Sequence, residues 1–251
     1  MSSFALSRLE SGSKTRDHSV CGLPVFSSKR KTNTVENLGF SISISMDQEL
    51  DPYICGCIIE FLVRYSPDDM HIKKVIEAFP PLKPRPQLKK AVLLRTMRTE
   101  VNAGDVSEKI LDALEKIGCI DRNQGLPIPD SMKEAYCAVA LECTVKYLPG
   151  DTDTCGAKYL DAVDRIWRGR IQELERSKAS DLVFDQLKNR RLQVEAAATG
   201  DEDAARCLSA INTRGYAIVS LRRYLREASG SMKPPVLEQA CLKLGRLNLG
   251  S

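Results

Sequence analysis

The stretch RPQLKKAVLLRTMRTEVNAGDVSEKILDALEKI, residues 85–117, decides the fold, because it contains two helix patterns joined by a tight turn. Apolar residues recur at helical spacing in each half of the stretch. Gly104 supplies a residue that tolerates a positive φ where the first helix ends. Asp105, with Glu108 three residues on, predicts an N-cap and a capping box for the second helix. The stretch is therefore strongly helical, and it contains no pattern typical of a catalytic site.

The same periodicity extends outward through most of the chain, interrupted by proline and glycine. Asp51-Pro52 is a typical start signal for a helix, and Ser131 with Glu134 predicts a further capping box. The sequence thus predicts an all-α, multi-helix bundle of about eight or nine helices.

The longest interior loop, GCIDRNQGLPIPD, gives the best candidate for a boundary inside this bundle. It divides an N-terminal helical subdomain, residues 47–122, from a C-terminal helical subdomain, residues 130–247. The two are expected to pack together, either as subdomains or as one continuous bundle.

Residues 1–46 differ from the rest, being rich in serine and poor in acids and periodicity, and we predict a disordered tail. Two other interpretations stay open: a weak nuclear-import cluster at Lys29–Lys31, or an organellar transit peptide. A short alternation of apolar and polar residues at Gly39–Ser45 is the one weak strand pattern.

Composition predicts a soluble intracellular protein. The chain has 251 residues and a formal charge of +4, which does not by itself require a polyanionic partner. Nine cysteines, an odd number without paired spacing, indicate a reducing compartment rather than a disulfide framework. Several fall on the apolar stripes of predicted helices, namely Cys55, Cys57, Cys137, Cys143 and Cys241. No apolar run approaches the roughly 20 residues that span a bilayer.

The motifs of an enzyme are missing from this sequence. It has two histidines, His18 and His71, no CxxC pair, and no glycine-rich phosphate loop. No cysteine can be placed beside His71 as a nucleophile. We therefore expect a non-enzymatic protein with no catalytic residues, cofactor, bound metal or small-molecule substrate.

Arginine-rich segments around Trp167 and Tyr224 provide a candidate nucleic-acid surface, because arginine binds phosphate and stacks on bases. A plainer interpretation makes Trp167 a core residue and the arginines helix-surface partners of Asp161, Asp164 and Glu227. We favour this plainer interpretation, so any nucleic-acid contact would be auxiliary. The candidate residues are Arg165, Arg168, Arg170, Lys188, Arg190, Arg191, Arg214, Arg222, Arg223 and Arg226.

Several segments together resemble a known family. The run PQLKKAVLLRTMRTEV…GDVSEKILDALEKI follows DPYICGCIIEFLVRY and IKKVIEAFPPL. YLDAVDRIWRGRIQELE, INTRGYAIVSLRRYLREA and PPVLEQAC come later in the chain. In order and character they are similar to the N-terminal helical region of plant TRF-like proteins, telomere repeat-binding factor-like members of the Myb/homeodomain-like group. The resemblance covers roughly residues 47–245.

This resemblance implies a nuclear protein associated with telomeres or chromatin. The chain differs from the family in its DNA-binding part. The family reads telomeric DNA with a C-terminal Myb-type module that has regularly spaced tryptophans, whereas this chain has one Trp, at position 167. No DNA-reading residue can therefore be carried over. The resemblance implies a short or truncated member that keeps the interaction part.

We accordingly expect dimerisation or partner docking through amphipathic helices, with indirect or weak DNA association and no membrane partner. Two alternatives stay open: a helical adaptor imported into a plastid, with residues 1–46 as a transit peptide, or a non-specific nucleic-acid binder that uses the arginine-rich helices within residues 165–191 and 214–226.

Overall fold

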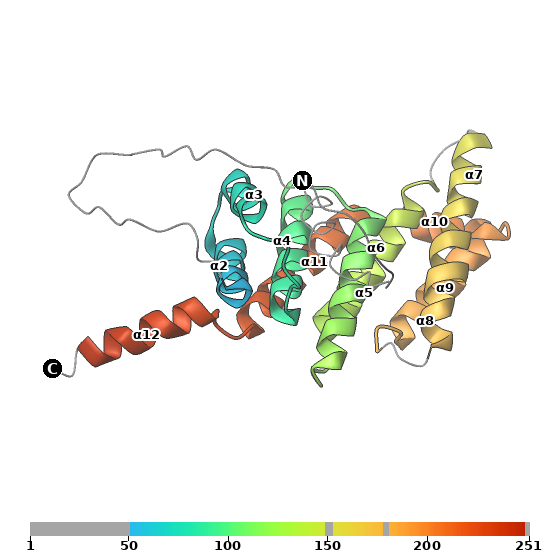
Figure 1. Ribbon diagram of the computed structural model, residues 1–251. Coiled ribbons are helices and arrows are strands. Elements are labelled where there is room, and N and C mark those ends of the chain that lie inside the picture. The colour runs from blue at the N-terminus through green and yellow to red at the C-terminus, as the bar shows by residue number, and fades with distance from the viewer. Residues whose placement is uncertain (1–50, 149–152, 178–180, 249–251) are drawn as a thin grey trace, which may run out of the picture.

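The computed structural model describes residues 51–148, 153–177 and 181–248, which form an all-α structure without strands (Figure 1). Ten helices are present in this part of the chain when the continuous segments α7, η2 and α8 count as one. The predicted fold class is confirmed, and the predicted number of helices was slightly low. The predictions for residues 1–46 lie outside the described residues. None of the described helices is both long and apolar enough to cross a membrane.

The first five helices form the N-terminal half of the described chain. They are α2 (Pro52–Tyr65), α3 (Asp69–Ala78), α4 (Pro86–Asn102), α5 (Glu108–Asn123) and α6 (Asp130–Val145).

The remaining helices begin with a long continuous one, whose middle turns are π-helical. It consists of α7 (Asp153–Ala162), η2 (Val163–Ile171) and α8 (Gln172–Arg176). It is followed by α9 (Asp185–Ala198), α10 (Glu202–Ser209), α11 (Thr213–Ser231) and α12 (Val236–Asn248).

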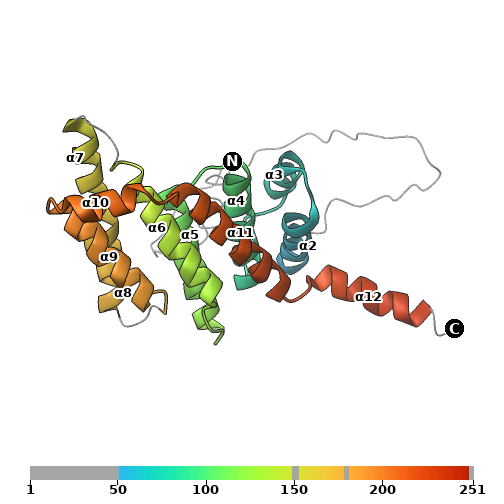
Figure 2. The same cartoon turned by 180° about the vertical axis from the view of Figure 1, so that it is seen from behind.

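The helices follow one another along an elongated body. Helices α2 and α3 lie at one end, α4 to α6 in the middle, and α7 to α10 at the other end (Figure 1). Helix α11 runs back along the middle helices and packs against both α6 and α4, as the reverse view shows (Figure 2). Helix α12 then extends away from the body beside α2 (Figures 1 and 2).

Two apolar clusters form the core. The larger one runs from Leu93 in α4 to Ala228 in α11 and includes the fully buried Trp167 and Tyr136. The smaller one joins α2, α3 and the first turns of α4, from Cys55 to Val92. The larger cluster contains residues from both sides of the predicted subdomain boundary, because α11 returns to α4. The division into subdomains stays a prediction.

The helix ends confirm some of the predicted caps. The Asp51 carboxylate accepts a hydrogen bond from the Tyr53 backbone N–H at 2.7 Å, and Pro52 is the first residue of α2. Gly104 has a φ of +71° just after α4 ends, as predicted for a glycine that closes a helix.

Both predicted capping boxes are wrong. Asp105 closes α4 instead of opening α5, since its backbone N–H donates to the Glu100 carbonyl at 2.9 Å. Ser107 is the residue that precedes α5, and it makes no side-chain cap. Helix α6 begins at Asp130, so Ser131 lies inside the helix, where its side chain is buried.

Candidate functional site

The arginines of η2 face the acidic side of α5, where Glu108, Asp112 and Glu115 share one face of the helix. Arg165 Nη2 lies 2.6 Å from Glu108 Oε1, and Arg165 also pairs with Asp161 in α7. Arg170 pairs with Asp112 and, at 3.4 Å, with Glu115. The hydrogen bonds that Arg165 donates to Glu108 and Asp161 raise its pKa, with Glu108 the stronger cause. Both arginines therefore join η2 to the rest of the fold.

Further arginines of the predicted nucleic-acid surface also have partners in the fold. Arg168 pairs with Asp164 at 2.8 Å, and Arg190 donates to the Gln193 side chain at 2.8 Å. The remaining three, with their partners, are Arg191 with Glu175 and Glu195, Arg214 with the Gly104 carbonyl, and Arg223 with Glu134.

Three of the predicted cations differ, because Lys188, Arg222 and Arg226 are exposed and form no ion pair with the described residues. Trp167 is fully buried, and its indole N–H donates to the Thr144 hydroxyl at 2.8 Å. The predicted core position of Trp167 and the predicted partners Asp161 and Asp164 are confirmed. The predicted partner Glu227 forms no ion pair with a described residue. Nucleic-acid contact at the ten basic residues stays a prediction.

Helix α12 carries an apolar face that the described residues leave largely uncovered. Leu237, Ala240, Cys241 and Leu244 recur on one side of this helix. Leu237 is half-buried and the other three are exposed, with Leu244 61% exposed. Cys241 was predicted to lie on a packed apolar stripe, and this is corrected: the stripe exists, but Cys241 is exposed. Cys55, Cys57, Cys137 and Cys143 are buried as predicted.

The first turn of α12 is fixed to α2 by polar contacts. The Tyr65 hydroxyl donates to Glu238 Oε2 at 2.5 Å, and this hydrogen bond raises the pKa of Tyr65. The Arg64 guanidinium donates to the Lys233 carbonyl at 2.6 Å. Helix α12 is therefore held at its start, while Ala240, Cys241 and Leu244 of its apolar face are exposed.

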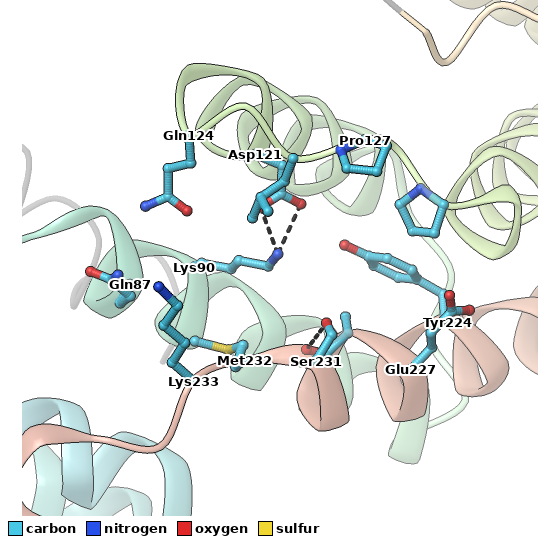
Figure 3. Close-up of a pocket in the computed structure, with 13 residues that line it drawn as sticks. Gln87, Lys90, Asp121, Gln124, Pro127, Tyr224, Glu227, Ser231, Met232 and Lys233 are labelled. Carbon is cyan, nitrogen blue, oxygen red and sulfur yellow. Dashed lines mark hydrogen bonds and ion pairs between the residues drawn. The ribbon is translucent and has the colours of Figure 1, made fainter. Parts of the chain in front are cut away.

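A cavity of about 590 Å³ lies between α4, the end of α5 and α11 (Figure 3). On one wall, Lys90 donates to both carboxylate oxygens of Asp121, at 2.6 and 2.8 Å. Both residues are buried. Apolar side chains complete much of the lining, from Leu126, Pro127, Pro129, Ala228 and Met232.

Tyr224 forms another wall of this cavity. Only 1% of the residue is exposed, and its hydroxyl points toward the space beside Lys90 and Asp121 (Figure 3). Among the described residues this hydroxyl has no hydrogen-bond partner. Burial, with the nearby carboxylates of Asp121 and Glu227, raises the pKa of Tyr224, so the group stays a protonated donor.

Sequence reasoning missed this cavity. Its polar residues, Lys90, Asp121 and Tyr224, come from three separate helix patterns, and each reads by itself as an ordinary helix residue. Lys90 and Asp121 fall on the buried sides of their helices, among apolar neighbours. A charged residue at a buried helix position was the one signal that could have drawn attention to the pair.

The described residues give no support for a metal site or for a role of His71 as a base. They contain no group of three or more His, Cys, Asp or Glu side chains that could hold a metal ion. His71 is exposed near the start of α3.

Comparison with known proteins adds no family assignment: no family model, no curated protein and no solved structure matches this chain.

Proposed function

We propose that this chain is a non-enzymatic helical interaction domain of a TRF-like plant nuclear protein, and that it dimerises through helix α12. The uncovered apolar face of α12 is the observation that carries the proposal. The placement with telomere- or chromatin-associated proteins rests on the family resemblance of the helical segments. DNA association is indirect or weak, since most of the basic candidates already bind partners in the fold.

The attachment of α12 supports an interaction role. An isolated helix of about a dozen residues is marginally stable in water, because most helix stability in proteins comes from packing an apolar face. Polar contacts to α2 hold the start of this 13-residue helix, but no described helix packs along Ala240, Cys241 and Leu244. A second polypeptide on this face would supply the missing packing.

The order of side-chain sizes on this face fits a second copy of the same chain. Leu237, Ala240, Cys241 and Leu244 give the pattern large, small, small, large, which is the same when read in reverse. In an antiparallel pair around a two-fold axis, Leu237 of one copy lies opposite Leu244 of the other. The small residues meet in the middle and allow the two helices to approach closely. A two-fold interface requires this kind of self-complementary surface.

Chemical cross-linking tests the proposal at one residue. In the antiparallel pair the two Cys241 thiols lie near the two-fold axis, so a short bis-maleimide should join two full-length chains through Cys241. We expect a covalent dimer with the wild type and with Cys207→Ser, which removes another exposed cysteine. We expect no dimer with Cys241→Ser. A dimer that persists in Cys241→Ser, or none in the wild type, contradicts self-association through α12.

A further inference from the structure

We propose that the cavity between α4, α5 and α11 binds an uncharged ligand that presents a carbonyl oxygen on a compact apolar group. The inference is independent of dimerisation through α12. It rests on three features of the cavity: its size, its unpartnered hydroxyl and its balanced charge.

The cavity has the dimensions of a ligand site. Its volume of about 590 Å³ falls within the roughly 300–1,000 Å³ typical of small-molecule pockets. Such pockets are mostly apolar, with a few polar groups that fix orientation. Here the apolar wall comes from the loop after α5 and from Met232, while Lys90 and Tyr224 supply donors (Figure 3).

The unpartnered hydroxyl of Tyr224 is the feature that points to a ligand. Buried polar groups in folded proteins nearly always have a hydrogen-bond partner, because an unsatisfied one destabilises the fold. The other fully or largely buried tyrosines follow this rule: Tyr136 donates to Glu115 at 2.6 Å and Tyr159 to the Val194 carbonyl at 2.9 Å. Tyr224 has a donor aimed into the cavity instead, and a bound acceptor would satisfy it.

Charge determines the class of acceptor. Asp121 binds the Lys90 ammonium through both oxygens, so this pair is neutral as a unit. At the rim, Glu227 and Lys233 are exposed and also balance each other in charge. An anionic ligand would compete with Asp121 for Lys90, and a cation would face the donors of Lys90 and Tyr224. A neutral carbonyl oxygen avoids both problems and can accept from the Tyr224 hydroxyl and from the third N–H of Lys90.

The experiment is a titration of the full-length protein with N-methylpyrrolidone, a small neutral lactam, followed by NMR of ¹³C-methyl-labelled methionine. Met232 lines the cavity, whereas Met97 and Met132 are fully buried in the core away from its lining and report any non-specific change. We expect a saturable shift of the Met232 signal alone. Propionate, an anion, and N-methylpyrrolidinium, a cation of the same ring without the carbonyl, should bind at least about fivefold more weakly.

Two matched variants separate binding from folding. Tyr224→Phe should weaken lactam binding about fivefold, the effect of losing one hydrogen bond, while the melting temperature stays the same or rises. Tyr159→Phe removes a satisfied buried hydroxyl, so it should lower the melting temperature and leave binding unchanged.

Three binding results would overturn the proposal. These are no saturable shift at Met232, equal binding by wild type and Tyr224→Phe, or a preference for propionate or N-methylpyrrolidinium. A fall in melting temperature in Tyr224→Phe would also count against it, because the hydroxyl would then have a structural partner.

Discussion

At the scale of single residues, the stability of the fold depends on a buried ion pair between Lys90 and Asp121. Lys90 and Asp121 bind each other inside the structure, with side chains 11% and 4% exposed. Breaking a buried ion pair by removing one partner leaves an uncompensated charge in a poorly solvated site. Replacing both partners by apolar residues leaves no uncompensated charge.

We therefore predict that Lys90→Met lowers the free energy of unfolding by about 3 kcal/mol. The double variant Lys90→Met with Asp121→Leu should recover most of that loss. Urea unfolding of the wild type and the variants measures both changes. Equal destabilisation by the single and the double variant would show that packing, and not the charge pair, is the cause.

The buried cysteine thiols give a pH dependence. Burial raises the pKa of Cys137 from 9.0 to about 12, partly opposed by the charge of Arg190. Below pH 9 the thiol is protonated in both the folded and the unfolded chain, so it does not affect stability. Between pH 9 and 12 the unfolded thiol ionises and the folded one does not, so stability falls as the pH rises.

From pH 8.5 to 10.5, the wild type should lose about 2 kcal/mol more stability than Cys137→Ala. Urea unfolding at the two pH values measures this difference, and Cys119→Ala, at an exposed position, serves as the control. If Cys137→Ala loses stability as steeply as Cys119→Ala, the thiol is not responsible.

At the scale of helices, the backbone conformation at a glycine decides whether another residue can replace it. Gly104 adopts a φ of +71° after α4, where a β-carbon is disfavoured whatever the free space. Gly56 lies inside α2, and a β-carbon added there meets nothing within 4 Å. The two glycines should thus respond to alanine in opposite directions.

We predict that Gly104→Ala lowers the free energy of unfolding by about 1 kcal/mol, because a left-handed backbone is unfavourable for alanine. Gly56→Ala should raise it by up to about 1 kcal/mol, since alanine is the better helix former. Thermal and chemical unfolding of both variants measure the signs. A stabilising Gly104→Ala would mean that the turn can adopt another backbone conformation.

Helices were the part of the structure that the sequence predicted best, because apolar spacing is a local signal. Arg165 with Asp161 and Arg168 with Asp164 were also predictable, since residues four apart on a helix are neighbours. The pairing of Arg165 with Glu108 was not, because the two residues are 57 positions apart and meet only through tertiary packing.

Apolar spacing also predicts that a helix has an apolar face. It does not predict whether another part of the chain packs against that face. The stripes on α6 and on α12 have the same periodicity. The one on α6 is buried, but the one on α12 is not. The cavity was unpredictable for a related reason, since α11 brings Tyr224 to Lys90 and Asp121 from more than 100 positions away.

At the scale of the whole molecule, most of the ten basic residues predicted to contact nucleic acid already have partners in the fold. Among the ten predicted nucleic-acid contacts, Lys188, Arg222 and Arg226 are the exposed ones that form no ion pair with the described residues. Arg222 and Arg226 lie on α11 and Lys188 on α9.

We predict that the full chain binds duplex telomeric-repeat DNA and a scrambled duplex equally and weakly. Contacts at Lys188, Arg222 and Arg226 alone would give a slope of log affinity against log salt no steeper than about −3, since each neutralised phosphate contributes about −0.9. Fluorescence anisotropy across a salt series measures both quantities. A preference for the telomeric repeat would show that the chain contains a DNA reader.

The central claim is self-association through the apolar face of α12, and sedimentation equilibrium tests it most directly. Leu244 lies on this face, while Leu242, 55% exposed, lies on the opposite side of the same helix. The wild type and Leu242→Glu should both show the mass of a dimer that dissociates on dilution, and Leu244→Glu should be monomeric. A wild-type monomer at every concentration, or the same mass for Leu244→Glu as for Leu242→Glu, would contradict the claim.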